Sequence, residues 1–364
     1  METIIADKIF TGEEWLTGKA IIVEQDLIAE IIDEAAVPVD AFVIRYDGCF
    51  IAPAFIDLQI YGAHGSLLAV EPSPATLYKM YEYCLAGGAT HFQPTVATNS
   101  YEVIYACIDA VKAYWQTGGK GVLGLHIEGP WINAKRKGAH VKSFIHSPTI
   151  QQVKELLEYG KEAISMITLA PEVCAGEIVE LIQSSGVIVS AGHSDATFEQ
   201  ATGFFNQNIS LATHLYNAMS PLHHRAPGMV GAILNHPKVS ASIVADGYHV
   251  DFAAISIAKN ILKDRLFYIT DAVTETKTGY YQHRFVAEKY EADGILSGSA
   301  LTMAKAVRNG VDFAGIELEE SLKMASLYPA RVMGLDHELG FIKKGYKTAL
   351  VVLDDAFHVV QKLT

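Results

Sequence analysis

Short apolar runs alternate with stretches of helical periodicity through most of the chain. From about residue 50 onward a strand-like run recurs eight times, and most of the connections between runs have the length of a helix. Apolar runs of this kind are typical of parallel strands that are buried on both faces. The runs are Phe50–Ile60, His91–Ala97, Val122–Glu128, Ser165–Ala170, Val187–Gly192, Ile209–Leu215, Ser242–Ala245 and Leu266–Thr270.

Eight consecutive strand and helix units predict an α/β fold, a TIM (β/α)8 barrel. The first connection shows the helical pattern clearly, because apolar residues recur at Leu77, Met80, Cys84 and neighbouring positions. The Gly87-Gly88 pair behind them predicts the end of that helix. In such a barrel the active site lies at the carboxyl ends of the strands.

The two ends of the chain have a different pattern. Residues 1–50 contain short alternating runs separated by turn residues, which is typical of a β-meander too thin to be stable alone. Residues 340–354 alternate in the same way after a helical region. We therefore expect residues 1–50 and 339–364 to form one small β-sandwich domain, with residues 51–338 as the TIM-barrel domain.

Charge, hydropathy and cysteine content exclude several classes of protein. The chain has 28 basic and 41 acidic residues, a formal charge of −13, which argues against a nucleic-acid partner or an anionic membrane surface. No apolar run reaches membrane-spanning length. The four cysteines show no pairing pattern and the N-terminus shows no secretion signal, so we expect a cytoplasmic protein.

Four of the eight runs end on a residue that can bind a metal or transfer a proton. A carboxylate at the end of a buried strand is costly unless another group holds its charge. Two imidazoles and one carboxylate form a ligand set of the kind that catalytic zinc uses, and a second carboxylate can serve as a general base. The pattern predicts a metal-dependent hydrolase built on Glu128, His193, His214 and Asp271.

Each of these residues also has a structural interpretation. With fourteen histidines in the chain, some fall at strand ends by chance, and Asp271 could serve only the turn after the eighth strand. Their combination at equivalent strand ends favours the metal site. We assign His126, two residues before Glu128 in the same strand, to packing.

Several segments resemble one known family. The residues are similar to those of the N-acetylglucosamine-6-phosphate deacetylases, within the amidohydrolase superfamily, over essentially the whole chain. The segment THLYNAM at 213–219 is the most specific, whereas GHS at 192–194 alone would indicate only the superfamily. The segments are Pro53–Asp57, Leu125–Trp131, Ala191–Ser194, Thr213–Met219, Ala245–His249, Thr270–Ala272 and Ser297–Met303.

The resemblance implies a role for individual residues. Glu128, His193 and His214 would hold one divalent metal per chain, expected to be zinc, and Asp271 would be the catalytic acid and base. His140 would contact the acetyl carbonyl. Arg225 resembles an arginine that reaches across a homodimer to the phosphate, although a loop arginine is by itself usually a solvated charge. The implied substrate-binding residues are Gln59, Ala139, Asn217, Ala218, Arg225, His249, Leu301 and Met303.

One departure from the superfamily pattern concerns a second metal. Many amidohydrolases carry His-x-His at the end of the first strand, where this chain has Gln59-Ile60-Tyr61. The fourth strand also offers no lysine that could bridge two metals, and His64 in a nearby loop matches no family ligand. The chain therefore resembles the one-metal branch of the family.

These features together predict hydrolysis of N-acetylglucosamine 6-phosphate, a small-molecule sugar phosphate, to glucosamine 6-phosphate and acetate. A deacetylase for N-acetylgalactosamine 6-phosphate would use the same metal and base, so the sugar epimer stays open. An amidohydrolase for cyclic amides is disfavoured by the intact segment at 213–219. A non-catalytic scaffold is disfavoured because the ligands and the base occur together.

Overall fold

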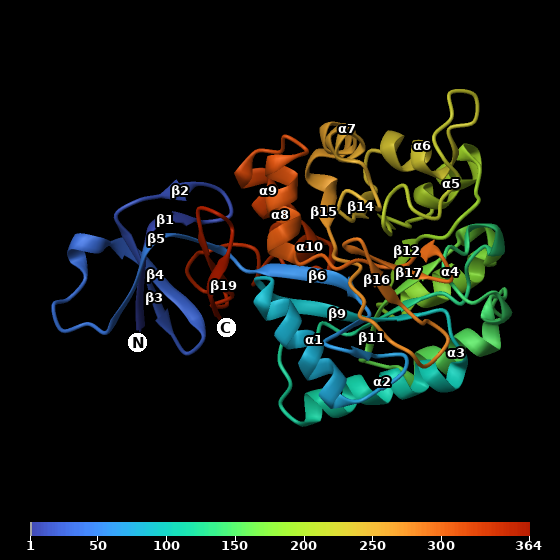
Figure 1. Cartoon of the computed structure of the whole chain (residues 1–364), viewed down its shortest axis with the longest axis horizontal. Helices are drawn as coiled ribbons and strands as arrows, with labels where there is room; N and C mark the ends of the chain where they lie inside the picture. The colour runs from blue at the N-terminus through green and yellow to red at the C-terminus, as the bar shows by residue number, and fades with distance from the viewer. Residues whose placement is uncertain (1) are drawn as a thin grey trace.

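The structure, a computed structural model that describes residues 2–364, consists of a large barrel with a small β-sheet body beside it (Figure 1). The barrel strands are parallel and lie in the order of the chain. This confirms the predicted TIM barrel. Its strands are β6 (Phe55–Ile60), β9 (Ala89–Ala97), β10 (Leu125–Glu128), β11 (Ile164–Leu169), β12 (Ile188–Ala191), β13 (Leu211–Ala212), β14 (Ser240–Ile243) and β15 (Leu266–Tyr268).

Helices follow the strands and cover the outside of the barrel (Figure 1). The first begins with Ser73 as its cap and Pro74 in its first turn, and ends at Gly87 as the sequence predicts. None of the helices within residues 2–364 is long and apolar enough to cross a bilayer. The helices are α1 (Pro74–Ala86), α2 (Tyr101–Gln116), α3 (Ile150–Tyr159), α4 (Gly176–Ser184), α5 (Phe198–Asn206), α6 (Gly228–Asn235), α7 (Phe252–Leu262), α8 (Met303–Asp312), α9 (Leu318–Ala325) and α10 (Leu327–Val332).

Smaller elements lie in the connections. After β15 the chain forms a three-stranded antiparallel sheet that the sequence did not predict. Its strands are β16 (Arg284–Val286), β17 (Lys289–Ala292) and β18 (Ile295–Leu296), and a hairpin of β7 (Gly62–Ala63) and β8 (Ser66–Leu67) follows the first barrel strand. Short 3-10 turns are η1 (Glu34–Ala36), η2 (Ala134–Arg136), η3 (Lys142–Phe144), η4 (Pro171–Val173) and η5 (Lys263–Arg265).

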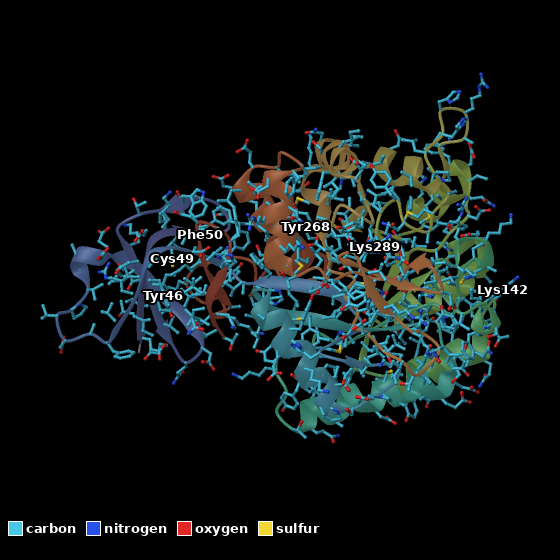
Figure 2. The ribbon with its side chains drawn as sticks, in the orientation of Figure 1. Tyr46, Cys49, Phe50, Lys142, Tyr268 and Lys289 are labelled. Carbon is cyan, nitrogen blue, oxygen red and sulfur yellow. The ribbon has the colours of Figure 1, made fainter. Side chains whose placement is uncertain are left out.

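The two ends of the chain share one seven-stranded sheet, so the predicted pairing of the termini is confirmed. Figure 2 shows Tyr46, Cys49 and Phe50 in this body and Tyr268 in the barrel. The strands are β1 (Glu2–Phe10), β2 (Trp15–Leu16), β3 (Lys19–Glu24), β4 (Leu27–Asp33), β5 (Val43–Pro53), β19 (Leu350–Asp354) and β20 (Val359–Leu363).

The order of this sheet differs from a simple meander. Strand β5 runs parallel to β1 on one side and antiparallel to β19 on the other. The sheet buries its own apolar cluster, which includes Ile4, Ile21, Ile51 and Val352. Because β5 extends to Pro53, the apolar run at 50–60 is divided between the two bodies. Domain boundaries at 50/51 and 338/339 stay a prediction.

A buried carboxylate fastens the first barrel strand to the last. Asp57 is 1% exposed. Its Oδ1 accepts hydrogen bonds from the backbone N–H groups of Thr270 (3.1 Å) and Gln59 (3.3 Å), and its Oδ2 accepts one from the Thr270 hydroxyl at 2.5 Å. Backbone bonds between Asp271 N and Gln59 O, and between Tyr61 N and Ala272 O, complete the closure. Burial raises the pKa of Asp57 to about 6, because desolvation outweighs these hydrogen bonds.

We expect Asp57→Asn to flatten part of the pH dependence of stability. The folded-state pKa of about 6 exceeds the ordinary value of 3.8. The stabilisation from the neutral acid is therefore complete below the lower value and is lost as pH rises through the higher one. Relative to the variant, wild type should lose up to about 3 kcal/mol between pH 4 and pH 7.

Calorimetric melting temperatures of both proteins, measured in chelator from pH 4 to pH 8, would check this expectation. Asparagine keeps an oxygen acceptor for the two backbone N–H groups, and the Thr270 hydroxyl has the Gln59 carbonyl as a second acceptor at 3.3 Å. A difference in melting temperature between the two proteins that stays constant from pH 4 to pH 8 would contradict the assignment of a raised pKa to Asp57.

Candidate active site

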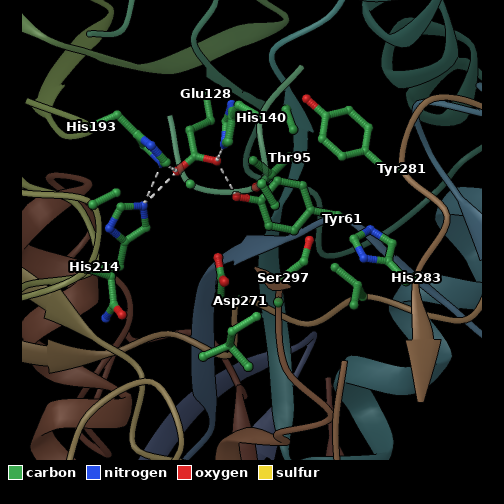
Figure 3. A pocket seen from close by; sticks show the side chains of 18 of the residues that line it. Tyr61, Thr95, Glu128, His140, His193, His214, Asp271, Tyr281, His283 and Ser297 are labelled. Atoms are coloured by element: carbon green, nitrogen blue, oxygen red, sulfur yellow. Dashed lines mark hydrogen bonds and ion pairs between the residues drawn. The ribbon is translucent and has the colours of Figure 1, made fainter. Parts of the chain in front are cut away.

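A cavity of about 180 Å³ lies at the carboxyl ends of the barrel strands (Figure 3). Nine of the residues that the sequence marked as candidates line this cavity, and they come from five different connections of the barrel. The shared edge of a parallel barrel therefore brings together side chains that are up to 143 positions apart in sequence (271 minus 128). They are Glu128, Ala139, His140, His193, His214, Asn217, Ala218, His249 and Asp271.

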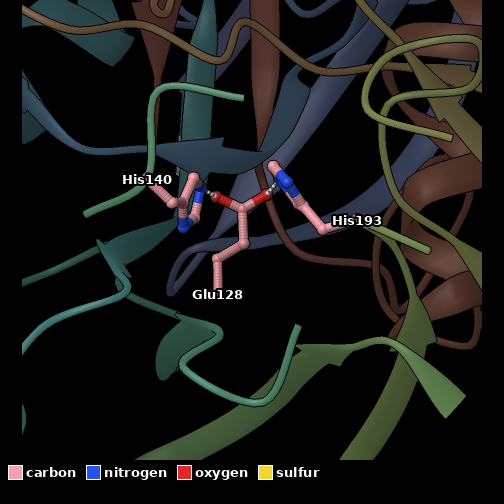
Figure 4. A group of neighbouring side chains, drawn as sticks. All are labelled: Glu128, His140 and His193. Atoms are coloured by element: carbon pink, nitrogen blue, oxygen red, sulfur yellow. Dashed lines mark hydrogen bonds and ion pairs between the residues drawn. The ribbon is translucent and has the colours of Figure 1, made fainter. Parts of the chain in front are cut away.

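The Glu128 carboxylate is the centre of a buried cluster. It is 1% exposed. Its Oε1 lies 2.9 Å from His214 Nε2 and 3.3 Å from His193 Nε2, and these two nitrogens are 3.1 Å apart. Its other oxygen, Oε2, lies 3.1 Å from His140 Nε2 (Figure 4). The predicted ligands thus meet around one carboxylate oxygen.

The protonation of His193 shows why this cluster suits a cation. His193 Nδ1 lies 2.8 Å from the Arg136 carbonyl oxygen, so Nδ1 carries the hydrogen and Nε2 carries a lone pair. Burial, together with His140, lowers the pKa of His193 to about 4, so the ring is neutral at pH 7. Burial opposes ionisation of Glu128, but the imidazoles around it, among them His140 through a hydrogen bond with Oε2, hold its pKa well below the usual range.

A neutral imidazole lone pair and a carboxylate oxygen therefore face each other at 3.3 Å. Two acceptors at this distance repel unless a cation lies among them. The donor set of two imidazole nitrogens and one carboxylate oxygen fits a divalent metal. His140 Nε2 is near enough to belong to the same group, since Glu128, His140 and His193 place one ligand atom each within 4.8 Å of the others.

Three of these residues have an unusual backbone conformation. His193, His214 and Asp271 have φ angles of 47°, 37° and 54°, in the left-handed region that residues with side chains rarely adopt. Backbone bonds on both sides hold Asp271 there, from its own N–H to Gln59 O and from Ser299 N–H to its carbonyl oxygen. Strain of this kind concentrates at functional sites, where it orients a side chain.

Asp271 lies beside the metal cluster with a definite set of partners. Gln59 Nε2 donates to Asp271 Oδ1 at 2.7 Å, and His249 Nε2 lies 3.9 Å from Oδ2. The other nitrogen of His249 faces Asp246 Oδ2 at 2.7 Å, which fixes the direction of the ring. Burial raises the pKa of Asp271, and the negative charge of Glu128 adds to this rise. A carboxylate with a raised pKa is suited to accept a proton.

Hydrogen-bond donors occupy the end of the first barrel strand, where many amidohydrolases carry His-x-His. Gln59 Nε2 faces Glu128 Oε1 at 3.2 Å as well as Asp271, and the Tyr61 hydroxyl donates to Glu128 Oε2. Amide and phenol hydrogens repel a cation where imidazole nitrogens would bind one. Gln59 and Tyr61 therefore supply hydrogen-bond donors to the carboxylates.

Part of the cavity wall consists of residues that were not predicted as site residues from the sequence. Tyr61, Tyr281, His283 and Ser297 line the cavity, and the last three belong to the segment around the unpredicted β16–β18 sheet. The Tyr281 hydroxyl donates to the Thr98 carbonyl at 2.6 Å, which fastens this segment over the barrel. The sequence feature that could have indicated this part of the wall is the pair Tyr281 and His283, since residues in alternate positions of an extended segment point to the same side.

Four predicted substrate-binding residues do not line the cavity. Gln59 lies beneath it and acts on the two carboxylates. Leu301 and Met303 are 2% and 1% exposed and pack in the barrel core, so their position does not support direct contact with a ligand. Arg225 is exposed, in the loop between β13 and α6 that projects past the helices in Figure 1.

Comparisons with known proteins agree with this geometry. Residues 50–363 match the model of the amidohydrolase family. The N-acetylglucosamine-6-phosphate deacetylase of Haemophilus influenzae is 33% identical over 97% of this chain and 95% of its own length. The N-acetylgalactosamine-6-phosphate deacetylase of Escherichia coli O157:H7 is 32% identical over 98% and 96%. The crystal structure of the Pasteurella multocida N-acetylglucosamine-6-phosphate deacetylase superposes with a TM-score of 0.96 at 32% identity, covering 100% of this chain and 98% of that one.

We expect His214→Ala and Glu128→Gln each to abolish tight metal binding. Each change removes one of three converging donors, so the loss of affinity should exceed the about 10- to 100-fold that removal of an outer hydrogen-bond partner costs. Metal content per chain, measured by plasma mass spectrometry after dialysis, checks this. His249→Ala is the matched control, because His249 lines the same cavity but lies outside the cluster. Full metal content in His214→Ala would contradict the ligand assignment.

Proposed function

The chain belongs to the amidohydrolase family, and we propose that it hydrolyses N-acetylglucosamine 6-phosphate to glucosamine 6-phosphate and acetate. The observation that supports this best is the meeting of Glu128, His193 and His214 with Asp271 in one cavity at the carboxyl ends of the barrel strands. A cation site beside a carboxylate with a raised pKa is suited to the attack of water on an amide. The relatives with this chemistry match almost the full length of the chain.

The metal in this proposal is one zinc ion per chain, held by Glu128, His193 and His214. Two imidazoles and one carboxylate are a common protein ligand set for catalytic zinc. When bound, a divalent cation acts as a Lewis acid that polarises a carbonyl oxygen and makes water a stronger acid. The donors of Gln59 and Tyr61 around Glu128 support a count of one rather than two.

Asp271 is the acid and base of the proposed reaction. Its Oδ1 is occupied by the Gln59 amide, so Oδ2 is the oxygen that accepts the proton of the attacking water. The same carboxyl group then gives this proton to the amide nitrogen, which leaves as a neutral amine. The raised pKa makes the Asp271 carboxylate a stronger base than an exposed aspartate, which favours the first of these transfers.

His140 is the second group that acts on the amide. The Thr98 hydroxyl lies 2.7 Å from His140 Nδ1, which leaves Nε2 directed at the space beside Glu128 Oε2. An N–H group there can donate to the acetyl carbonyl oxygen as negative charge develops on it. One such donor is commonly worth about 3 kcal/mol in the transition state.

The sugar phosphate is assigned to the side of the cavity formed by Asn217, Ala218, Ala139 and His249. Asn217 and Ala218 belong to a turn in which Ala218 has a φ of 49°, and both residues line the cavity. His249 is held by Asp246 and can donate to a sugar hydroxyl. Gln59 acts through Asp271. Leu301 and Met303 are buried in the core near α1, where the Tyr83 hydroxyl donates to the Leu301 carbonyl, so we assign them a structural role.

We further propose that the enzyme is a cytoplasmic homodimer in which Arg225 binds the phosphate of the partner's substrate. Arg225 is exposed and is not among the residues that line its own cavity. Arg225 forms no ion pair with any acidic group among residues 2–364, whereas the chain as a whole is acidic. Such a free cation is well suited to an anionic ligand.

The galactosamine epimer is the second candidate substrate. A relative that is named for N-acetylgalactosamine 6-phosphate is 32% identical, against 33% for the glucosamine relative, so identity does not separate the two. Acetate release from both phosphorylated epimers and from unphosphorylated N-acetylglucosamine tests the proposal. We expect the phosphorylated glucosamine substrate to give the highest kcat/KM and removal of the phosphate to lower it at least about 100-fold. Absence of acetate release from all three sugars by the zinc-loaded protein would refute it.

We expect Asp271→Asn to retain zinc and substrate binding while kcat falls about 10²- to 10⁴-fold, the usual contribution of a general acid and base. The asparagine oxygen can still accept the hydrogen bond from Gln59, so the surrounding structure is preserved. Zinc content and calorimetric binding of the phosphorylated sugar are the controls. A variant with substantial turnover would show that another group moves the proton.

A mixing experiment tests the role of Arg225. Arg225→Ala should raise KM for the phosphorylated sugar at least about ten-fold, because it removes a charge-assisted contact. If the arginine acts across a dimer, an exchanged equimolar mixture of Arg225→Ala and Asp271→Asn chains should recover activity. In random exchange about a quarter of all sites then combine an intact base with a partner's arginine. A mixture that is no more active than the sum of its parts would place Arg225 elsewhere.

A further inference from the structure

The partner that orients His193 lies on an irregular loop. The loop after β10 spans residues 129–149 and contains only the short turns η2 and η3. Within it the Arg136 carbonyl oxygen faces His193 Nδ1 at 2.8 Å, and the Asn133 N–H donates to the His193 carbonyl at 3.0 Å. No strand or α-helix fixes this carbonyl, so other contacts have to determine where it lies.

The side chain of the same arginine supplies such a contact. Arg136 Nε donates to Asp195 Oδ1 at 2.7 Å, and Asp195 follows His193 by two residues. Arg136 thus joins the loop to the 193–195 segment twice, through its carbonyl and through its guanidinium. Neighbouring Lys135 also reaches Asp195, at 3.3 Å from Oδ2, but its side chain is 79% exposed against 33% for Arg136.

Glu172 connects this pair to the barrel. It lies in η4, directly after β11. Its Oε1 accepts from Asn133 Nδ2 at 2.9 Å and from the Asp195 N–H at 2.7 Å, and its Oε2 accepts from the Ser194 hydroxyl at 2.8 Å. One carboxylate therefore holds the connections after the third and fifth barrel strands against the connection after the fourth.

His140 depends on the same loop. It follows Arg136 by four residues, and its ring centroid lies 4.3 Å from that of His193 (Figure 4). A shift of the loop would therefore move the donor assigned to the acetyl carbonyl as well as the carbonyl that orients His193.

We propose that Arg136 and Asp195, supported by Glu172, are positioning residues that set the affinity of the site for its metal. This deepens the proposed function and depends on it only in taking His193 as a metal ligand. Without a fixed carbonyl at Nδ1 the ring can turn, and its proton can move to Nε2, the nitrogen that has to be free for a metal. We call Arg136, Asp195 and Glu172 the clamp. Without it, part of the free energy of metal binding is used to restore the orientation and tautomer of His193, so the affinity falls.

Zinc affinity of the full-length protein, measured by competition with a chromophoric chelator, tests the clamp. Arg136→Ala should weaken zinc binding about 10- to 100-fold, as loss of an outer partner of a metal ligand does. Lys135→Ala is the matched control: it removes the adjacent cation from the same carboxylate, and we expect an effect within about two-fold, as for an exposed ion pair. Asp195→Asn, which has nearly the same size, should follow Arg136→Ala.

The double variant Arg136→Ala with Asp195→Asn should lose no more zinc affinity than either single variant, since the two residues act as one unit. The proposal would be overturned if Arg136→Ala and Asp195→Asn bound zinc as tightly as Lys135→Ala does. It would also be overturned if Arg136→Ala and Asp195→Asn lowered the melting temperature of the metal-free protein but left the zinc affinity unchanged. Because no sugar is used, a wild-type protein that binds zinc but releases no acetate would refute the proposed function and leave the clamp testable.

Discussion

The burial of the Glu128 carboxylate is the constraint on which the site depends. Removing a carboxylate from water costs several kcal/mol, and this cost is tolerable only where neighbouring groups replace the lost hydration. The two Glu128 oxygens are supported differently. Oε1 faces the Nε2 atoms of His193 and His214, whereas Oε2 faces the Tyr61 hydroxyl and His140. Oε1, which the Gln59 amide also faces at 3.2 Å, is the oxygen around which the two imidazoles meet and where a cation can lie, whereas Oε2 accepts the hydrogen bond of the Tyr61 hydroxyl.

This asymmetry accounts for the chemistry of the whole cavity. The donors Gln59 and Tyr61 both face Glu128, and Gln59 joins Glu128 to Asp271. The two carboxylates therefore differ in role although they share one amide. Glu128 has its pKa held far down and stays ionised, while Asp271 has its pKa raised by burial and by the neighbouring charge. Such a separation of two pKa values is what the proposed roles require, Glu128 in metal binding and Asp271 in proton transfer.

The regular parts of this protein were predictable from sequence, and the irregular parts were not. Buried parallel strands read as apolar runs, so the eight strands and the residues at their ends, such as His193 and Asp271, could be located. The β16–β18 segment carries no such signal, because most of its residues are exposed and its short strands pair only with one another. The boundary within 50–60 was hidden for a different reason, since β5 and β6 are both buried there and only Ala54 separates them.

Contacts made by irregular backbone were beyond sequence reasoning altogether. The acceptor that orients His193 is the main-chain carbonyl of Arg136, and a main-chain contact cannot be predicted from residue type. Glu172 and Asp195 have no sequence feature that distinguishes them from exposed acidic residues. Their function arises only because the barrel brings three connections to one edge. The barrel itself is closed by Asp57 and Thr270, which are buried and do not line the cavity. The residues that close the barrel are therefore distinct from those that line the cavity. The connections carry the strained backbone of His193, His214 and Asp271. The hydrogen-bonded barrel strands hold these residues in that conformation.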